Sequence, residues 1–222
     1  MTEIWHDWES RYRSADVPTD AFCTDGIVDM AAYQGTKPKL LFVLKEVNSP
    51  APGKWDLRRR LREHWDPMAR ALAKWTAGIL CGFRQSYHEV SKDRDLLHTS
   101  LCRVAVVNLK KVGGGATSDM NVINAFAYVA KDLLVRQIEE IRPDIVVAGG
   151  VFATLMWLLD LGVKPLSIRQ GLPVRDNVRN LWVIPWRHPS RGDQARYYEQ
   201  LGAVILRCPE LSKQLGETRS PT

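Results

Sequence analysis

Cysteine is scarce in this chain, with only four cysteines among 222 residues. No two of them form a C-x-x-C pair, and no histidine lies at zinc-finger spacing from them. The sequence therefore indicates neither a disulfide framework nor a structural zinc site. We expect reduced thiols, no metal ion and no other cofactor. An iron–sulfur cluster is the alternative that spacing alone leaves open; its ligands would be Cys23, Cys81, Cys102 and Cys208.

Long apolar runs are also missing. No run approaches the roughly 20 residues that a membrane-spanning helix needs. The opening residues, MTEIWHDWES, lack the basic-then-apolar order of a secretory signal. We expect a cytoplasmic monomer with no membrane partner. The chain is 45% hydrophobic and 25% charged, which excludes a disordered or collagen-like protein and predicts a single globular domain over residues 1–222.

Charge and aromatic content are the most distinctive features of the composition. The chain carries 31 Lys and Arg against 25 Asp and Glu, a formal net charge of +6, and has eight tryptophans. A basic surface with aromatic side chains suits nucleic acid. The alternative is an ordinary basic protein whose tryptophans lie in its core.

Four short apolar runs predict buried strands, at residues 39–45, 103–109, 144–148 and 181–186. Helical patterns alternate with them, at residues 118–142, 151–161 and 193–206. A Trp-rich opening helix, a basic helical stretch and a polar, frayed tail complete the chain, near the N-terminus, at 56–77 and after 211. This alternation predicts an α/β fold, a three-layer α/β/α sandwich around a mostly parallel four-stranded sheet.

In such a sheet, ligands bind beyond the carboxyl ends of the strands. The first strand is followed by Glu46, which can orient a water molecule or balance a developing cation, or can simply cap the loop. The second strand ends at Asn108, whose amide can bind the edge of a pyrimidine or hold a turn. Lys110 and Lys111 follow it and can bind a phosphate backbone or lie in a solvated loop.

The fourth strand leads into the segment Arg-His-Pro-Ser-Arg, residues 187–191. A residue before proline is held in extended geometry, so His188 is directed from the sheet end toward the cleft. Ser190 and Arg191 stand near the start of the closing helix, where backbone N–H groups favour an anion. The pair Gly149 and Gly150 lacks the full G-x-G-x-x-G pattern and predicts only a tight turn that lets a helix pack close to the sheet.

The order of these segments resembles the uracil-DNA glycosylase superfamily. The segments that carry the resemblance are LFVLKEVNSP, VAVVNLKK, RPDIVVAGGVFA and WVIPWRHPSRG, and it covers roughly residues 38–207. His-Pro-Ser after an apolar strand is moderately specific, and a strand that ends in Asn supports it. The resemblance implies an enzyme that flips a base out of DNA and hydrolyses its N-glycosidic bond.

The resemblance also implies a role for each residue. His188 would stabilise the carbonyl oxygen of the departing base, and Asn108 would hydrogen-bond the edge of that base. Glu46 or Asn48 would position water beneath the sugar. Ser190 would hold a phosphate, and Arg191 falls where family members often carry a wedge. Further candidate contacts for the DNA backbone are Lys110, Lys111 and Arg187. Trp55, Trp75 and Phe83 are candidates for stacking on the base, and the alternative for each is a place in the core.

The first loop departs from the family pattern. Lys45 stands where the family usually has glycine, so the water-positioning role stays open between Glu46 and Asn48. Uracil-specific members place a bulky tyrosine in this loop, whereas this chain offers small or polar residues such as Ser49. We therefore expect the pocket to admit uracil or C5-modified pyrimidines, including hypermodified phage bases, in duplex or single-stranded DNA, with a role in repair or in phage defence.

Two alternatives belong to other functional classes. One is a non-catalytic nucleic-acid-binding module that keeps the fold. The other is a hydrolase acting on a small nucleoside or nucleotide.

Overall fold

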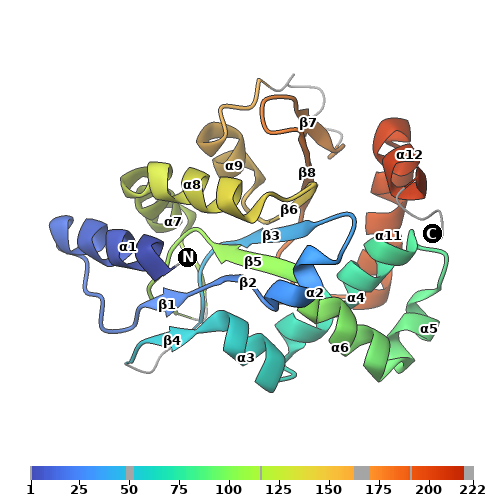
Figure 1. Cartoon of the computed structure of the whole chain (residues 1–222), viewed down its shortest axis with the longest axis horizontal. Helices are drawn as coiled ribbons and strands as arrows, with labels where there is room; N and C mark the ends of the chain where they lie inside the picture. Colours follow the sequence, from blue (N-terminus) through green and yellow to red (C-terminus); the bar gives the residue numbers. More distant parts are fainter. Residues whose placement is uncertain (1, 49–52, 116, 163–170, 191, 218–222) are drawn as a thin grey trace.

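The computed structural model describes residues 2–48, 53–115, 117–162, 171–190 and 192–217 (Figure 1). Its strands are β1 (Cys23–Thr24), β2 (Gly26–Ile27), β3 (Leu40–Leu44), β4 (Trp55–Asp56), β5 (Val104–Asn108), β6 (Ile145–Gly149), β7 (Val174–Asp176) and β8 (Leu181–Trp186). Its helices are α1 (Thr2–Ser14), α2 (Met30–Gln34), α3 (Leu57–Glu63), α4 (Pro67–Cys81), α5 (Tyr87–Lys92), α6 (Arg94–Cys102), α7 (Met120–Val129), α8 (Lys131–Ile141), α9 (Phe152–Leu158), α11 (Gln194–Leu206) and α12 (Pro209–Glu217).

The main sheet has six strands in the order β2-β5-β3-β6-β8-β7. The four predicted strands are its centre, β5-β3-β6-β8, and they run parallel. The predicted count of four is too low, because β2 and β7 add antiparallel edges to a mixed sheet. These edge strands have two and three residues, too few to produce an apolar run. A separate two-stranded parallel sheet pairs β1 with β4.

Helices cover both faces of the main sheet, as the three-layer expectation requires (Figure 1). Alternate residues of a strand point to opposite faces, and β3 divides in this way: Leu40, Phe42 and Leu44 join one buried cluster, and Leu41 and Val43 join the other. The first cluster contains residues of α3, α4, α5, α6, α11 and α12. The second contains residues of α1, α7, α8 and α9.

Helix boundaries follow local capping chemistry. The basic stretch predicted over 56–77 divides into α3 and α4 at Asp66-Pro67, because proline suits the first turn of a helix and the Asp66 side chain accepts a hydrogen bond from the Ala69 N–H. The helix predicted over 118–142 is interrupted at Ala130, whose φ of −119° departs from helical geometry.

The frayed tail predicted after residue 211 is wrong over the part that the structure describes. The chain forms α12, and Leu211 and Leu215 of this helix are buried in the first cluster. The side chain of Gln214 accepts a hydrogen bond from Trp182 Nε1. Over the described residues, no helix combines the length and the apolar character that a bilayer span requires.

Candidate active site

A cavity of about 500 Å³ opens where the loops after β3, β5 and β8 meet the beginnings of α3 and α4. The ends of parallel strands supply one side of it, which is where an open α/β sheet places its ligands. Five of the predicted site residues line it: Glu46, Asn48, Trp55, His188 and Ser190. The structure therefore brings together residues that are up to 144 positions apart, from Glu46 to Ser190.

Glu46 is held in an ion pair. Its Oε2 atom lies 2.5 Å from Lys110 Nζ, and both side chains are nearly buried, with exposures of 6% and 10%. Gly114 packs directly on the carboxylate, since a β-carbon at that position would lie 2.0 Å from Oε2. Gly114 also donates its backbone N–H to the Val47 carbonyl at 2.9 Å. The loops after β3 and β5 thus close around one carboxylate.

Asn48 is two residues further along the same loop and is exposed. It forms an isolated parallel bridge with Gly114. Both candidates for the water-positioning role therefore line the cavity, but only Glu46 is held there by an ion pair. Ser49, the small residue noted in this loop, lies outside the described residues.

His188 presents a neutral imidazole to the cavity. The Ser190 backbone N–H lies 3.3 Å from His188 Nδ1, and the Ser190 hydroxyl lies 2.9 Å from the same atom. A backbone N–H can only donate, so Nδ1 accepts and the neutral ring carries its proton on Nε2. Burial, reinforced by the nearby charge of Lys45, lowers the pKa of His188 to about 4. At neutral pH, Nε2 is therefore a hydrogen-bond donor that carries no net charge.

Lys45 approaches His188 because Gly150 leaves room for it. Gly150 has a φ of +75°, and a β-carbon there would lie 3.2 Å from Lys45 Cε and 3.6 Å from His188 Cβ. Gly150 supplies the predicted turn between β6 and α9, whereas Gly149 is the last residue of β6. Glycine suits the position because it adopts a positive φ without steric cost.

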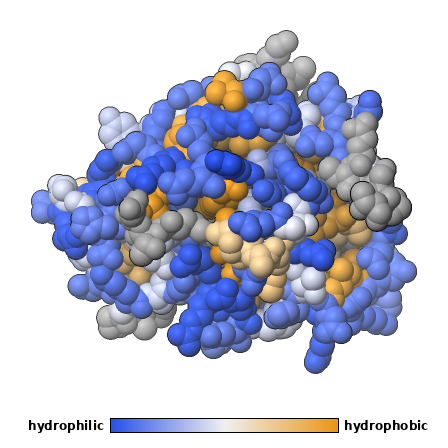
Figure 2. Space-filling model, viewed as in Figure 1, coloured by the Kyte–Doolittle hydropathy of each residue, from blue (hydrophilic) through white to orange (hydrophobic). Residues whose placement is uncertain are grey.

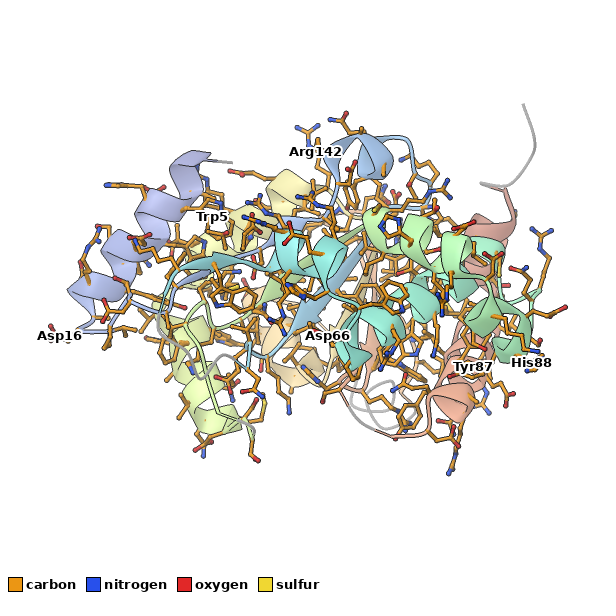
Figure 3. The ribbon with its side chains drawn as sticks, turned by 90° about the horizontal axis from the view of Figure 1, so that it is seen from below. Trp5, Asp16, Asp66, Tyr87, His88 and Arg142 are labelled. Atoms are coloured by element: carbon orange, nitrogen blue, oxygen red, sulfur yellow. The ribbon has the colours of Figure 1, made fainter. Side chains whose placement is uncertain are left out.

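The opposite wall of the cavity contains residues that the sequence analysis did not select. Arg60 of α3 places its guanidinium 5.8 Å from the centre of the Trp55 ring and lies 3.5 Å from the Asp66 carboxylate. Asp66, labelled in Figure 3, caps α4, and Met68 lies on the first turn of that helix. Trp55 thus remains a candidate platform for a base. The sequence signal that could have indicated this wall is Asp66-Pro67, a typical helix start.

Lys111 is completely buried, so its ammonium is not accessible to a DNA phosphate. Its Nζ atom lies 2.8 and 2.9 Å from the two carboxylate oxygens of Asp25 and 2.9 Å from Gln137 Oε1. The Trp8 ring centre is 4.9 Å away. Burial lowers the pKa of Lys111, and the charge of Asp25 opposes that shift. The predicted phosphate contact is therefore wrong, and Lys111 is part of the core.

Lys110 is also misassigned as a phosphate contact, since it is 8% exposed and paired with Glu46. Asn108 is 1% exposed and is absent from the described lining of the cavity. Its backbone N–H donates to Asp25 at 2.8 Å, and its side-chain amide lies 3.5 Å from the same oxygen. The structure thus ties Asn108 to Asp25 and does not bring it into the site.

Phe83 is separated from the cavity by the length of α4. It follows the C-terminus of that helix, about 20 Å from the first turn at 1.5 Å per residue. There it packs on Gly78, Gly202 and Tyr198. The prediction that it stacks on a base is therefore wrong. Trp75 is likewise a core residue, with no exposed surface.

Arg187 lines a neighbouring cavity of about 710 Å³ on the other side of the β8 end. Its guanidinium lies 4.0 Å from the Tyr197 ring centre and 5.2 Å from that of Trp186. Arg207 lines the same cavity. This hollow is larger, but no acidic residue is among its described lining, so we assign the chemistry to the cavity that holds Glu46 and His188. Arg191, the predicted wedge, lies outside the described residues.

Cys23, Cys81 and Cys102 are on β1, α4 and α6, Cys208 lies between α11 and α12, and none of the four is in a disulfide. Burial raises the pKa of the Cys23 thiol, and more weakly that of Cys102. Among the described residues, no group of three or more His, Cys, Asp or Glu side chains is arranged to hold a metal ion. The iron–sulfur alternative therefore has no ligand cluster in the described part of the chain.

Comparison with models of known protein families gives no match, and comparison with curated proteins gives no significant match either.

Proposed function

We propose that this protein is a DNA glycosylase that hydrolyses the N-glycosidic bond of a flipped uracil or C5-modified pyrimidine. One observation carries the proposal: Glu46, a carboxylate, and His188, a neutral donor, line the same cavity from the ends of two parallel strands. Breaking an N-glycosidic bond develops positive charge on the sugar and negative charge on the base. A carboxylate and a hydrogen-bond donor each stabilise that transition state more than the ground state.

The proposed reaction uses groups of this chain and one water molecule. The C1′–N bond breaks and its electron pair moves onto the base, whose carbonyl oxygen accepts a hydrogen bond from His188 Nε2–H. Water then attacks C1′, and its proton passes to the Glu46 carboxylate, leaving an abasic sugar. The base takes up a proton from solvent as it leaves. Trp55 would stack on the flipped base, a contact typically worth about 1–3 kcal/mol.

The proposal is tested by incubating the protein with duplex and single-stranded oligonucleotides that carry uracil or C5-modified pyrimidines. Alkali then cleaves any abasic site. We expect strand scission at the modified position. Glu46→Gln and His188→Ala should each slow base release by at least about 100-fold, because each removes a group that acts in the transition state. His98→Ala is the matched control, since His98 is exposed on α6.

Absence of scission on every substrate would contradict the glycosylase proposal. A nucleoside or nucleotide hydrolase is the second candidate, because Lys110 and Lys111 are withdrawn from the surface that DNA would contact. Release of free base from nucleosides, without scission of any oligonucleotide, would favour it. Tight DNA binding without base release would instead indicate a non-catalytic binding module.

A further inference from the structure

We infer that Lys110 is a positioning residue that holds the Glu46 carboxylate for attack of water on the sugar. This inference rests on the proposed glycosylase function. Lys110 was predicted to contact DNA phosphate, but its ammonium group is directed into the protein. Its Nζ atom lies 2.5 Å from Glu46 Oε2 and 3.3 Å from the Gly113 carbonyl oxygen, and 5.3 Å from the centre of the Phe126 ring.

The ion pair fixes one carboxylate oxygen and leaves the other available. Lys110 binds Oε2, and among the described residues no group donates a hydrogen bond to Oε1. A carboxylate can accept hydrogen bonds through both oxygens. Because Glu46 lines the cavity, Oε1 is the atom we assign to the attacking water. Gly114, packed against the same carboxylate, restricts its rotation.

Hydrogen bonds hold the backbone of Lys110 and of the residue before it. Its N–H donates to the Lys45 carbonyl at 3.0 Å, next to the bond from Leu109 to Leu44 at 2.9 Å. The next residue, Lys111, is directed to a different partner in the core, where Asp25 binds its ammonium. Its backbone N–H also donates to the Tyr12 hydroxyl at 3.0 Å. These contacts fix the backbone from which Lys110 reaches Glu46.

The first test separates positioning from DNA contact. We expect Lys110→Met to lower kcat by at least about 10-fold, since small misplacements of catalytic groups can cost up to 100-fold. Its Kd for an oligonucleotide should stay within about twofold of wild type. Lys110→Arg, which keeps a donor and a charge, should recover part of the rate. Lys131→Met is the matched control, because Lys131 pairs with the exposed Asp160 on the surface.

A kcat of Lys110→Met within twofold of wild type would overturn the inference. Weaker DNA binding at unchanged kcat would also overturn it, because it would make Lys110 a phosphate contact. Neither result questions the glycosylase proposal, which fails only if the wild-type protein releases no base.

A second readout does not depend on catalysis. Proton–nitrogen NMR of lysine ammonium groups should show signals protected from solvent for both buried lysines, Lys110 and Lys111, and the Lys110 signal is the one that disappears in Lys110→Met and in Lys110→Arg. We expect Glu46→Gln to remove its protection, whereas Lys131→Met should leave it unchanged. This measurement uses Glu46→Gln as the reporter, so it remains decisive if Lys110→Met does not fold. The Lys111 signal should stay protected in Glu46→Gln, since Asp25 binds that ammonium; a Lys110 signal that also stays protected would contradict the pairing.

Discussion

His188 has a fixed backbone direction and a neutral ring, and its sequence context indicated only the first of these. Proline at position 189 holds the chain extended, and Ser190 occupies Nδ1 with two hydrogen-bonding groups. Burial keeps the ring neutral at pH 7. A neutral imidazole with its proton on Nε2 can stabilise a developing oxyanion by donating a hydrogen bond to it.

The depressed pKa of His188 makes stability depend on pH. Between about pH 6.5 and 4 the unfolded chain binds a proton at this residue and the native protein does not, so stability falls as pH falls across that window. We expect urea unfolding at pH 4.5 and 7 to differ by about 2 kcal/mol more in wild type than in His188→Gln. An equal pH dependence in both proteins would contradict the depressed pKa.

Lys111 is a charged residue whose burial gives it a role in stability and not in surface binding. Removing one partner of a buried pair leaves the other charge uncompensated, which typically costs about 3–5 kcal/mol. We expect Lys111→Met to lose stability of that order in urea unfolding because Asp25 is then unpaired. Lys131→Met, at an exposed pair, should change stability by less than about 1 kcal/mol. A stable Lys111→Met protein that binds DNA more weakly would instead support the original phosphate assignment.

At the scale of elements, the site depends on the approach of two loops. The loops after β3 and β5 are joined by the bond from the Gly114 N–H to Val47, and β8 brings the His188 segment to the same edge. The backbone of the second loop passes so close to Glu46 that only glycine fits at position 114 without displacing the carboxylate.

Gly114→Ala tests this approach. The added methyl group would overlap Glu46, so we expect a loss of about 1–3 kcal/mol in stability, typical of overpacking, together with slower base release. Gly115→Ala is the control for stability, since a β-carbon there meets no atom within 4 Å. Equal urea midpoints for the two variants would show that the loops adjust freely.

At the scale of the whole molecule, the net charge of +6 does not come to the surface at the two lysines after β5, where we expected it. Lys110 and Lys111 contribute to the count but not to the surface. Arginine is concentrated instead on α3, which carries Arg58, Arg59, Arg60 and Arg62. Figure 1 places α3 in the lower part of the view, and the same part of Figure 2 is strongly hydrophilic. Arg60 of this helix lines the candidate active site. Any DNA contact should therefore involve arginine more than lysine.

Salt dependence distinguishes surface contacts from buried ones. If DNA lies across the β8 end, Arg187→Ala should weaken binding and reduce the slope of log K against log salt by about one. Lys110→Met should leave that slope unchanged, since Lys110 does not reach the surface. Arg136→Ala is the control, because Arg136 of α8 pairs with Asp7 of α1 and with Glu140 of its own helix. Fluorescence anisotropy at several salt concentrations measures all three variants. An Arg187→Ala slope equal to wild type would exclude this residue from the DNA contact.

The sequence by itself determined the four central strands, the α/β class and the loops that carry Glu46 and His188. Apolar runs and proline act locally, so they can be recognised without knowledge of the fold. The sequence did not determine that Lys110 and Lys111 are both buried. It also did not determine where Phe83 packs, or that Asp66 and Arg60 line the candidate site. Those outcomes depend on which segments meet across the sheet, and contacts between distant residues leave no local pattern. Tertiary structure alone therefore decided that of two consecutive lysines one would pair with Glu46 beside the candidate site and the other with Asp25 in the core.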